Sequence, residues 1–277
     1  MTRVMVTGAA GQLGSVIVSR LSKTSDVIAY TRKDLDLADA AAVLEKTASC
    51  NPDVVINCAA YNDVEAAEDA AAAALTGNAL AVQALARAAT AYGATLIHYS
   101  TDFVFDGTAD RPYLETDACR PLSTYGMSKL LGEWFALEAP GAYVLRVESL
   151  FGGHPAKSSI DKILSTIRAG QPVRVFSDRT VTPSFVDDVA MATEKIMNER
   201  PAPGIYHCVN SGVTPWLGIA TEIVALLGRE AEIIPVKSTE VKLKARRPVY
   251  CALSNQKLKE AGIEMPTWRE ALARYLE

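Results

Sequence analysis

The stretch Val4-Met5-Val6-Thr7-Gly8-Ala9-Ala10-Gly11-Gln12-Leu13-Gly14 decides the fold of this chain. A short apolar run leads directly into three glycines with the spacing Gly-x-x-Gly-x-x-Gly. Gly8 permits a tight turn, Gly11 lets the backbone approach a diphosphate, and Gly14 lets the next helix lie against the strand. Because a helix N-terminus favours anions, the stretch predicts a dinucleotide-binding strand, turn and helix.

Strand-like runs alternate with helical segments through the first half of the chain, at residues 4–6, 27–30, 54–57, 95–99 and 143–147. This alternation predicts a parallel sheet with helices on both faces. The alanine-rich segment 63–91 favours helix by composition, so we expect a packed helix or helix pair there. The predicted fold class is α/β, with a Rossmann-type doubly wound parallel sheet.

The pattern loosens after Phe151. We predict short strands outside the main sheet at 173–176 and 233–236, separated by helices around 160–167, 186–197 and 217–227. Residues 1–150 are therefore expected to form a dinucleotide-binding domain. Residues 151–277 are expected to form mainly a smaller C-terminal substrate-binding lobe, with segments that interleave back into the main domain.

Composition excludes several classes of partner. A net charge of −4 and a pI near 5.5 argue against nucleic acid or an anionic membrane as the main partner. The five cysteines are scattered and include no Cys-x-x-Cys pair, so we expect reduced thiols, a cytoplasmic location and no metal site. The oligomeric state, a homodimer included, stays open.

Tyr125 and Lys129 lie four residues apart, downstream of Ser100-Thr101. On a helix these two side chains share a face, and a neighbouring ammonium is expected to lower the pKa of a tyrosine that donates a proton to a carbonyl oxygen. Thr101, at the end of a predicted strand, can hydrogen-bond the same oxygen. Alone, Tyr-x-x-x-Lys is more often a surface pair; combined with the glycine stretch, it predicts a nucleotide-cofactor oxidoreductase.

The end of the second predicted strand bears on cofactor choice. An NAD-preferring site places an acidic residue there, whereas a 2′-phosphate needs basic groups. This chain has Thr31, Arg32 and Lys33, with no acid before Asp34. We therefore predict that NADPH is preferred over NADH, the alternative being that both basic side chains are simply solvated.

Several longer motifs resemble one family nearly end to end. The chain resembles an extended short-chain dehydrogenase/reductase and is similar to the dTDP-4-dehydrorhamnose reductase family. The motifs are Thr7-Gly8-x-x-Gly11-x-x-Gly14, Asn57-Cys58-Ala59-Ala60-Tyr61, Asp63-Val64-Glu65, His98-Tyr99-Ser100-Thr101-Asp102-Phe103-Val104-Phe105-Asp106-Gly107, Tyr125-Gly126-x-x-Lys129, Thr182-Pro183 and Ala245-Arg246-Arg247-Pro248.

This resemblance implies reduction of the 4-keto group of a nucleotide-linked 6-deoxy-sugar by a reduced nicotinamide, with Thr101, Tyr125 and Lys129 as catalytic residues. It implies dTDP-4-dehydrorhamnose as the substrate. The substrate contacts that it implies are Asp102, Phe103, Ser149, Arg246 and Arg247. The implied cofactor contacts are Gly8, Gly11, Gln12, Leu13, Gly14, Thr31, Arg32, Lys33, Asp36, Leu37, Asn57, Ala59, Ala60, Tyr61, Asn78 and Ser100, with Tyr125 and Lys129.

Two departures from the family pattern bear on the sugar. Phe103 stands where the family has tyrosine, and Ser149 stands where it has tryptophan, which removes an aromatic wall. Two other functions stay open: a nucleotide-sugar dehydratase or epimerase, and a non-catalytic NADP-binding subunit similar to the regulatory subunit of methionine adenosyltransferase. Against the dehydratase, Phe103 replaces the glutamate that elimination would use.

Overall fold

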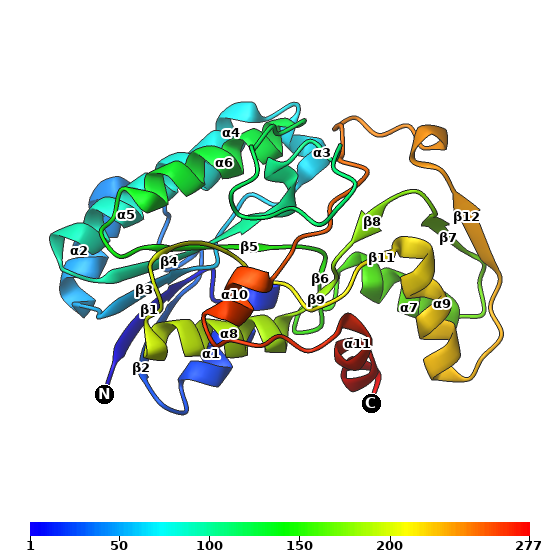
Figure 1. The fold of residues 1–277 in the computed structure, drawn as a ribbon. Helices are drawn as coiled ribbons and strands as arrows, with labels where there is room; N and C mark the ends of the chain where they lie inside the picture. Colours follow the sequence, from blue (N-terminus) through cyan, green and yellow to red (C-terminus); the bar gives the residue numbers. More distant parts are fainter.

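Six parallel strands form the central sheet, in the order β2, β1, β3, β4, β5 and β10 (Figure 1). The computed structural model describes residues 1–277. The strands are β1 (Arg3–Thr7), β2 (Asp26–Tyr30), β3 (Val54–Asn57), β4 (Thr95–Thr101), β5 (Tyr143–Val147) and β10 (Gly204–His207). β1 pairs with both β2 and β3, so the strand order reverses there, and ligand crevices form outside such a switch point. The predicted fold class is confirmed.

Helices cover both faces of this sheet (Figure 1). On one face lie α1 (Gln12–Leu21) and α8 (Val186–Glu199), and on the other lie α2 (Ala40–Cys50), α5 (Ala81–Ala91) and α6 (Thr124–Leu137). Successive residues of β1 point to opposite faces: Val4 and Val6 join the first core, and Met5 joins the second. Burial on both faces explains why the strands are almost wholly apolar.

The alanine-rich segment is helical, as predicted, and is interrupted. It forms α3 (Val64–Ala67), α4 (Ala71–Leu75), a π-helical turn η1 (Thr76–Leu80) and then α5. A π turn inside a helix is uncommon and often marks a functional position. Here it carries Asn78 in a fully buried position.

The later part of the chain forms small paired strands beside helices α7 (Ser159–Arg168) and α9 (Trp216–Leu227). The predicted strands β7 (Val173–Phe176) and β12 (Ile233–Val236) pair in parallel with each other, outside the main sheet. Two further pairs are β6 (Leu150–Phe151) with β9 (Ser184–Phe185) and β8 (Thr180–Val181) with β11 (Thr214–Pro215). The remaining elements are η2 (Asp102–Val104), η3 (Ser238–Glu240), α10 (Gln256–Glu260) and α11 (Trp268–Leu276).

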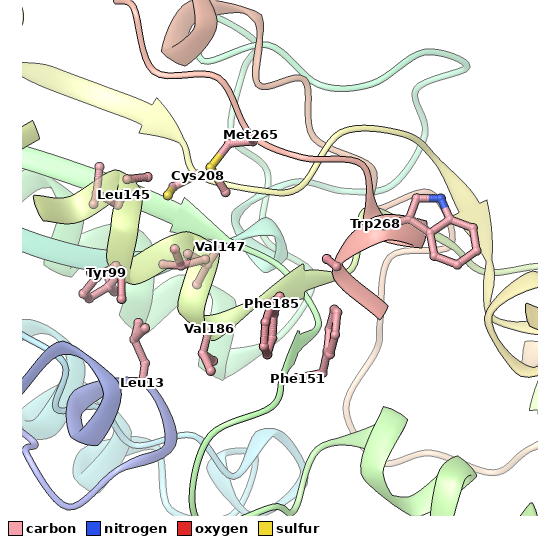
Figure 2. Packing of buried hydrophobic residues seen from close by; sticks show 14 of the residues in the cluster. Leu13, Tyr99, Leu145, Val147, Phe151, Phe185, Val186, Cys208, Met265 and Trp268 are labelled. Atoms are coloured by element: carbon pink, nitrogen blue, oxygen red, sulfur yellow. The ribbon is translucent and has the colours of Figure 1, made fainter. Parts of the chain in front are cut away.

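An aromatic cluster joins β6, β9 and α11 in the later part of the chain. Phe151 and Phe185 stack with their ring centroids 5.4 Å apart, and Figure 2 shows the two rings side by side, with Phe185 next to Val186. Tyr275 of α11 packs edge-on against Phe151. β10, which the sequence did not predict, returns from the later part of the chain to pair with β5. No helix combines the length and apolar composition needed to cross a bilayer.

Candidate active site

A cleft of about 1200 Å³ opens at the carboxyl ends of the central strands. The segments that line it follow directly on β3, β4 and β5: residues 57–60, 101–103 and 148–150. Its outer part is lined by α7, β7 and neighbouring loops. Parallel strands bring these segments to one sheet edge, which is where α/β folds bind ligands.

The glycine turn has the space that a diphosphate requires. Gly8 has a φ of +69°, and a Cβ there would lie 2.5 Å from the Ala59 amide nitrogen. A Cβ on Gly14 would collide with the Gly8 carbonyl oxygen. No side chain caps the N-terminus of α1, so its first-turn N–H groups stay available to an anion. Gly11, Gln12 and Leu13 line the cleft beside this turn.

Thr101, Tyr125 and Lys129 all line the same cleft. Thr101 ends β4, whereas the other two lie one turn apart on α6, so the prediction of a shared helix face is confirmed. Ser123 caps this helix by accepting a hydrogen bond of 3.1 Å from the Gly126 amide. The Lys129 Nζ donates to the Tyr99 carbonyl oxygen at 2.5 Å.

The electrostatics of Tyr125 differ from the expectation. Burial, followed by the nearby Asp102 carboxylate, raises the pKa of Tyr125 above its usual value. Burial lowers the pKa of Lys129 to about 8. The expectation that Lys129 lowers the pKa of Tyr125 is therefore wrong for this structure, because burial is the largest cause of the shift and Lys129 is not among its causes.

Two buried asparagines brace the floor of the cleft. The Asn57 Oδ1 accepts hydrogen bonds from the Thr7 hydroxyl at 2.8 Å and from the Ala59 amide at 3.0 Å. The Asn78 Oδ1 accepts from the Tyr61 amide at 2.7 Å, and its Nδ2 donates to the Ser128 hydroxyl at 2.9 Å. Asn78 thus ties the loop after β3 to α6. Neither Asn78 nor Tyr61 lines the cleft itself, whereas Ala59, Ala60 and Ser100 do.

The segment after β2 lies next to the glycine turn, since the Ala9 amide donates to the Tyr30 carbonyl oxygen. Asp34 caps this segment by accepting hydrogen bonds from Thr31. Arg32 and Lys33 are exposed there. The cleft lining does not include these residues, nor Thr31, Asp36 and Leu37.

Of the expected substrate contacts, Asp102, Phe103, Ser149 and Arg247 line the cleft and Arg246 does not. Phe103 packs edge-on against Tyr125, with ring centroids 5.7 Å apart. Ser149 has a φ of +45°, which is uncommon for a residue with a side chain. Arg247 donates to the Glu65 carboxylate at 2.7 Å, whereas Arg246 is exposed.

Several cleft residues were missed by the sequence analysis. They are Glu148, Arg179 and, in the outer part, Lys157, Lys162, Arg174, Phe176 and Trp216. A glutamate between the apolar runs of β5 and β6 was the one visible signal for Glu148. The outer residues come from short elements that carry no motif, so no spacing could have grouped them.

Comparisons with known proteins show the family of this chain. The family model described as "RmlD substrate binding domain" matches residues 1–277. The spore coat polysaccharide biosynthesis protein SpsK of Bacillus subtilis is 37% identical, over 100% of this chain and 98% of its own length. The dTDP-4-dehydrorhamnose reductase of Burkholderia thailandensis is 36% identical, over 98% of this chain and 96% of its own.

A solved structure adds the cofactor. The crystal structure of dTDP-4-dehydrorhamnose reductase from Bacillus anthracis in complex with NADP superposes with a TM-score of 0.95. It is 29% identical and covers 99% of this chain and 98% of its own. The likeness extends over the glycine turn and the outer part of the cleft alike.

Proposed function

This chain belongs to the dTDP-4-dehydrorhamnose reductase family, and we propose that it reduces the 4-keto group of dTDP-4-dehydrorhamnose with NADPH. The observation that carries the proposal is the convergence of Thr101, Tyr125 and Lys129 in one cleft beside the glycine turn. The product is then dTDP-L-rhamnose. Residues 1–150 hold the cofactor, and residues 151–277 supply much of the substrate side.

The residues of the cleft divide the work of a carbonyl reduction. When bound, NADPH supplies the hydride. Burial keeps the Tyr125 hydroxyl protonated at neutral pH, so Tyr125 can give its proton to the carbonyl oxygen. Thr101 can donate a hydrogen bond to that oxygen when its hydroxyl hydrogen is not held by Asp102, and Lys129 adds positive charge that stabilises the developing alkoxide.

The outer part of the cleft suits a nucleotide diphosphate. Lys157, Lys162, Arg174 and Arg247 line it and provide the cations that phosphate oxygens attract. The aromatic rings of Phe176 and Trp216 lie in the same lining, which suits a base. We therefore assign the nucleotide to this part and the sugar to the inner part beside Asp102, Phe103 and Ser149.

The two alternatives fit less well. A dehydratase of this fold would carry its glutamate directly after Asp102, and that position holds Phe103, which packs against Tyr125. A non-catalytic subunit has no need for Thr101, Tyr125 and Lys129 to line one cleft. We also place the enzyme in the cytoplasm, because all five cysteines are free thiols.

The proposal is tested by following NADPH absorbance with dTDP-4-dehydrorhamnose and the Tyr125→Phe variant. Loss of the proton donor should lower turnover by roughly a hundred- to ten-thousandfold. Tyr92→Phe, at an exposed position outside the cleft lining, serves as a matched control with unchanged turnover. Full activity in a folded Tyr125→Phe protein would remove Tyr125 from the mechanism.

A further inference from the structure

Two buried carboxyl groups lie side by side at the floor of the cleft. Asp102 follows β4 and Glu148 follows β5, with only 4% and 2% of their surfaces exposed. An oxygen of each lies within 4.8 Å of the other and of the Cys251 sulfur. Two carboxylates this close in an apolar site do not both ionise near neutral pH. The pair therefore holds a proton.

The hydrogen bonds around the pair are unequal. One oxygen of Glu148 accepts from both the amide (2.7 Å) and the hydroxyl of Thr182, whereas its other oxygen, Oε1, is buried without a partner. The Asp102 Oδ1 accepts the hydroxyl hydrogen of Thr101 at 2.9 Å. The Thr101 hydroxyl has one hydrogen, so while Asp102 accepts it, Thr101 has none for a carbonyl oxygen in the cleft.

The positive charge near the two carboxyl groups is enough to balance one carboxylate. Arg179 is 6% exposed, and its Nε donates to the Pro248 carbonyl oxygen at 3.3 Å while its Nη2 lies 3.7 Å from the Cys251 sulfur. One guanidinium can balance one of the two carboxylates. The titratable groups that face the pair are Tyr125 from α6, Arg179 from the loop before β8, and Tyr250 and Cys251 from the loop after Pro248.

Burial separates the two acids further. It raises the pKa of Asp102 to about 6, and it raises the pKa of Glu148 well above its usual range, with the Asp102 charge adding to the second shift. The Glu148 Oε1 is buried with no donor to stabilise a negative charge, whereas the Asp102 Oδ1 accepts a hydrogen bond from Thr101, so Glu148 is the member of the pair that keeps its proton when Asp102 ionises.

We propose that Glu148 is a positioning residue: as a neutral acid, it leaves Asp102 as the titrating carboxyl of the pair and so sets the direction of the Thr101–Asp102 hydrogen bond. When Asp102 takes a proton from solvent, its O–H donates to Thr101, and the Thr101 hydrogen turns toward the substrate oxygen. The kinetic consequence rests on the proposed ketone reduction. The protonation of Glu148 does not.

The first test is the pH dependence of thermal stability for wild type and Glu148→Gln. A folded-state pKa above the unfolded value means that the wild type loses stability as pH rises above the unfolded pKa, up to the folded one. The amide variant has no such loss. Its Tm relative to wild type should therefore rise between pH 5 and 8, by about 2 °C per pH unit for a chain of this size.

Glu138→Gln, at an exposed glutamate on the same protein, is the matched control and should show a constant difference in Tm. A constant difference for Glu148→Gln as well would mean that Glu148 is ionised in the folded protein, and it would overturn the proposal.

The second test is the pH profile of turnover. Wild-type turnover should rise as pH falls through about 6, since the protonated Asp102 frees Thr101. Glu148→Gln should keep the wild-type midpoint, because it preserves a neutral partner. Glu148→Ala should move the midpoint to lower pH, because water that enters the space favours the Asp102 carboxylate. Asp102→Asn should abolish this pH-dependent rise in turnover.

A flat wild-type profile, or equal shifts in both Glu148 variants, would contradict the positioning role. If no variant, wild type included, reduces the nucleotide sugar, the proposed function fails, and the stability measurement still decides the protonation of Glu148.

Discussion

The two walls of the cleft are built from different materials. The wall at residues 8–14 is mostly backbone: glycines pack against backbone atoms, and a helix N-terminus has no side-chain cap. The outer wall consists of long charged and aromatic side chains on α7, short paired strands and loops, such as Lys162, Arg174 and Phe176. The first wall fits a diphosphate, a group common to many cofactors. In the second wall, a change of side chains can change which ligand binds. A substitution in the first wall should therefore disrupt cofactor binding, whereas a substitution in the second should change substrate preference.

The largest effect is expected for Gly14→Ala. The new Cβ would collide with the Gly8 carbonyl oxygen, which is backbone and cannot turn aside. Such overpacking typically costs about 1–3 kcal/mol of stability. Displacing the turn should weaken NADPH binding by about tenfold or more, as measured by fluorescence titration.

Gly93→Ala is the control for this change. Unlike Gly14, Gly93 has a positive φ, of +68°, and nothing lies within 4 Å of an added Cβ. It should lose some stability from strain and keep its NADPH affinity. Equal NADPH affinities for the two variants would mean that the fit of the turn does not govern cofactor binding.

A smaller effect is expected for the double variant Arg32→Ala and Lys33→Ala. Both side chains are exposed beside the glycine turn, where they can reach a 2′-phosphate. Their loss should weaken NADPH binding by up to about tenfold, because both side chains are exposed to solvent, and should leave NADH binding nearly unchanged. Equal losses for both cofactors would show that these residues do not bind the 2′-phosphate.

The smallest effect is expected for Ser149→Trp in the variable wall. Ser149 already has a positive φ, so a larger side chain meets a backbone strain that is already present. For dTDP-4-dehydrorhamnose, the indole adds an aromatic surface, and kcat/KM should stay within about tenfold of wild type or rise. If the pocket instead serves a bulkier sugar, the indole should block that sugar by overfilling the site, and neither protein should reduce dTDP-4-dehydrorhamnose.

The sequence predicted best what depends on neighbouring residues. The glycine turn, the Tyr125 and Lys129 helix face and strands such as β3 and β5 follow from local pattern and appear as expected. β10 was missed because Gly204–His207 is a short run whose partner β5 lies about sixty residues away in sequence. The π turn around Asn78 was missed for a similar reason: it depends on contacts to Tyr61 and Ser128.

The protonation states and hydrogen-bond partners of the site residues were harder to predict than which residues form the site. The sequence shows that Thr101 and Asp102 are neighbours, but it does not show that Glu148, at the end of another strand, lies beside Asp102 in the folded protein. The wrong expectation for the pKa of Tyr125 has the same origin, since it considered a neighbouring charge and not the desolvation of the whole cleft. Both depend on how completely folding excludes water, which no local motif encodes.

The central claim is that the protein catalyses hydride transfer from NADPH to the C4 carbonyl of dTDP-4-dehydrorhamnose. NADPH labelled with deuterium at its transferred position, incubated with the protein and this substrate, tests it most directly. The account predicts consumption of the cofactor and a dTDP-linked 6-deoxy-hexose with deuterium at C4, seen by mass spectrometry and NMR. No transfer, or a label at another carbon, would contradict it.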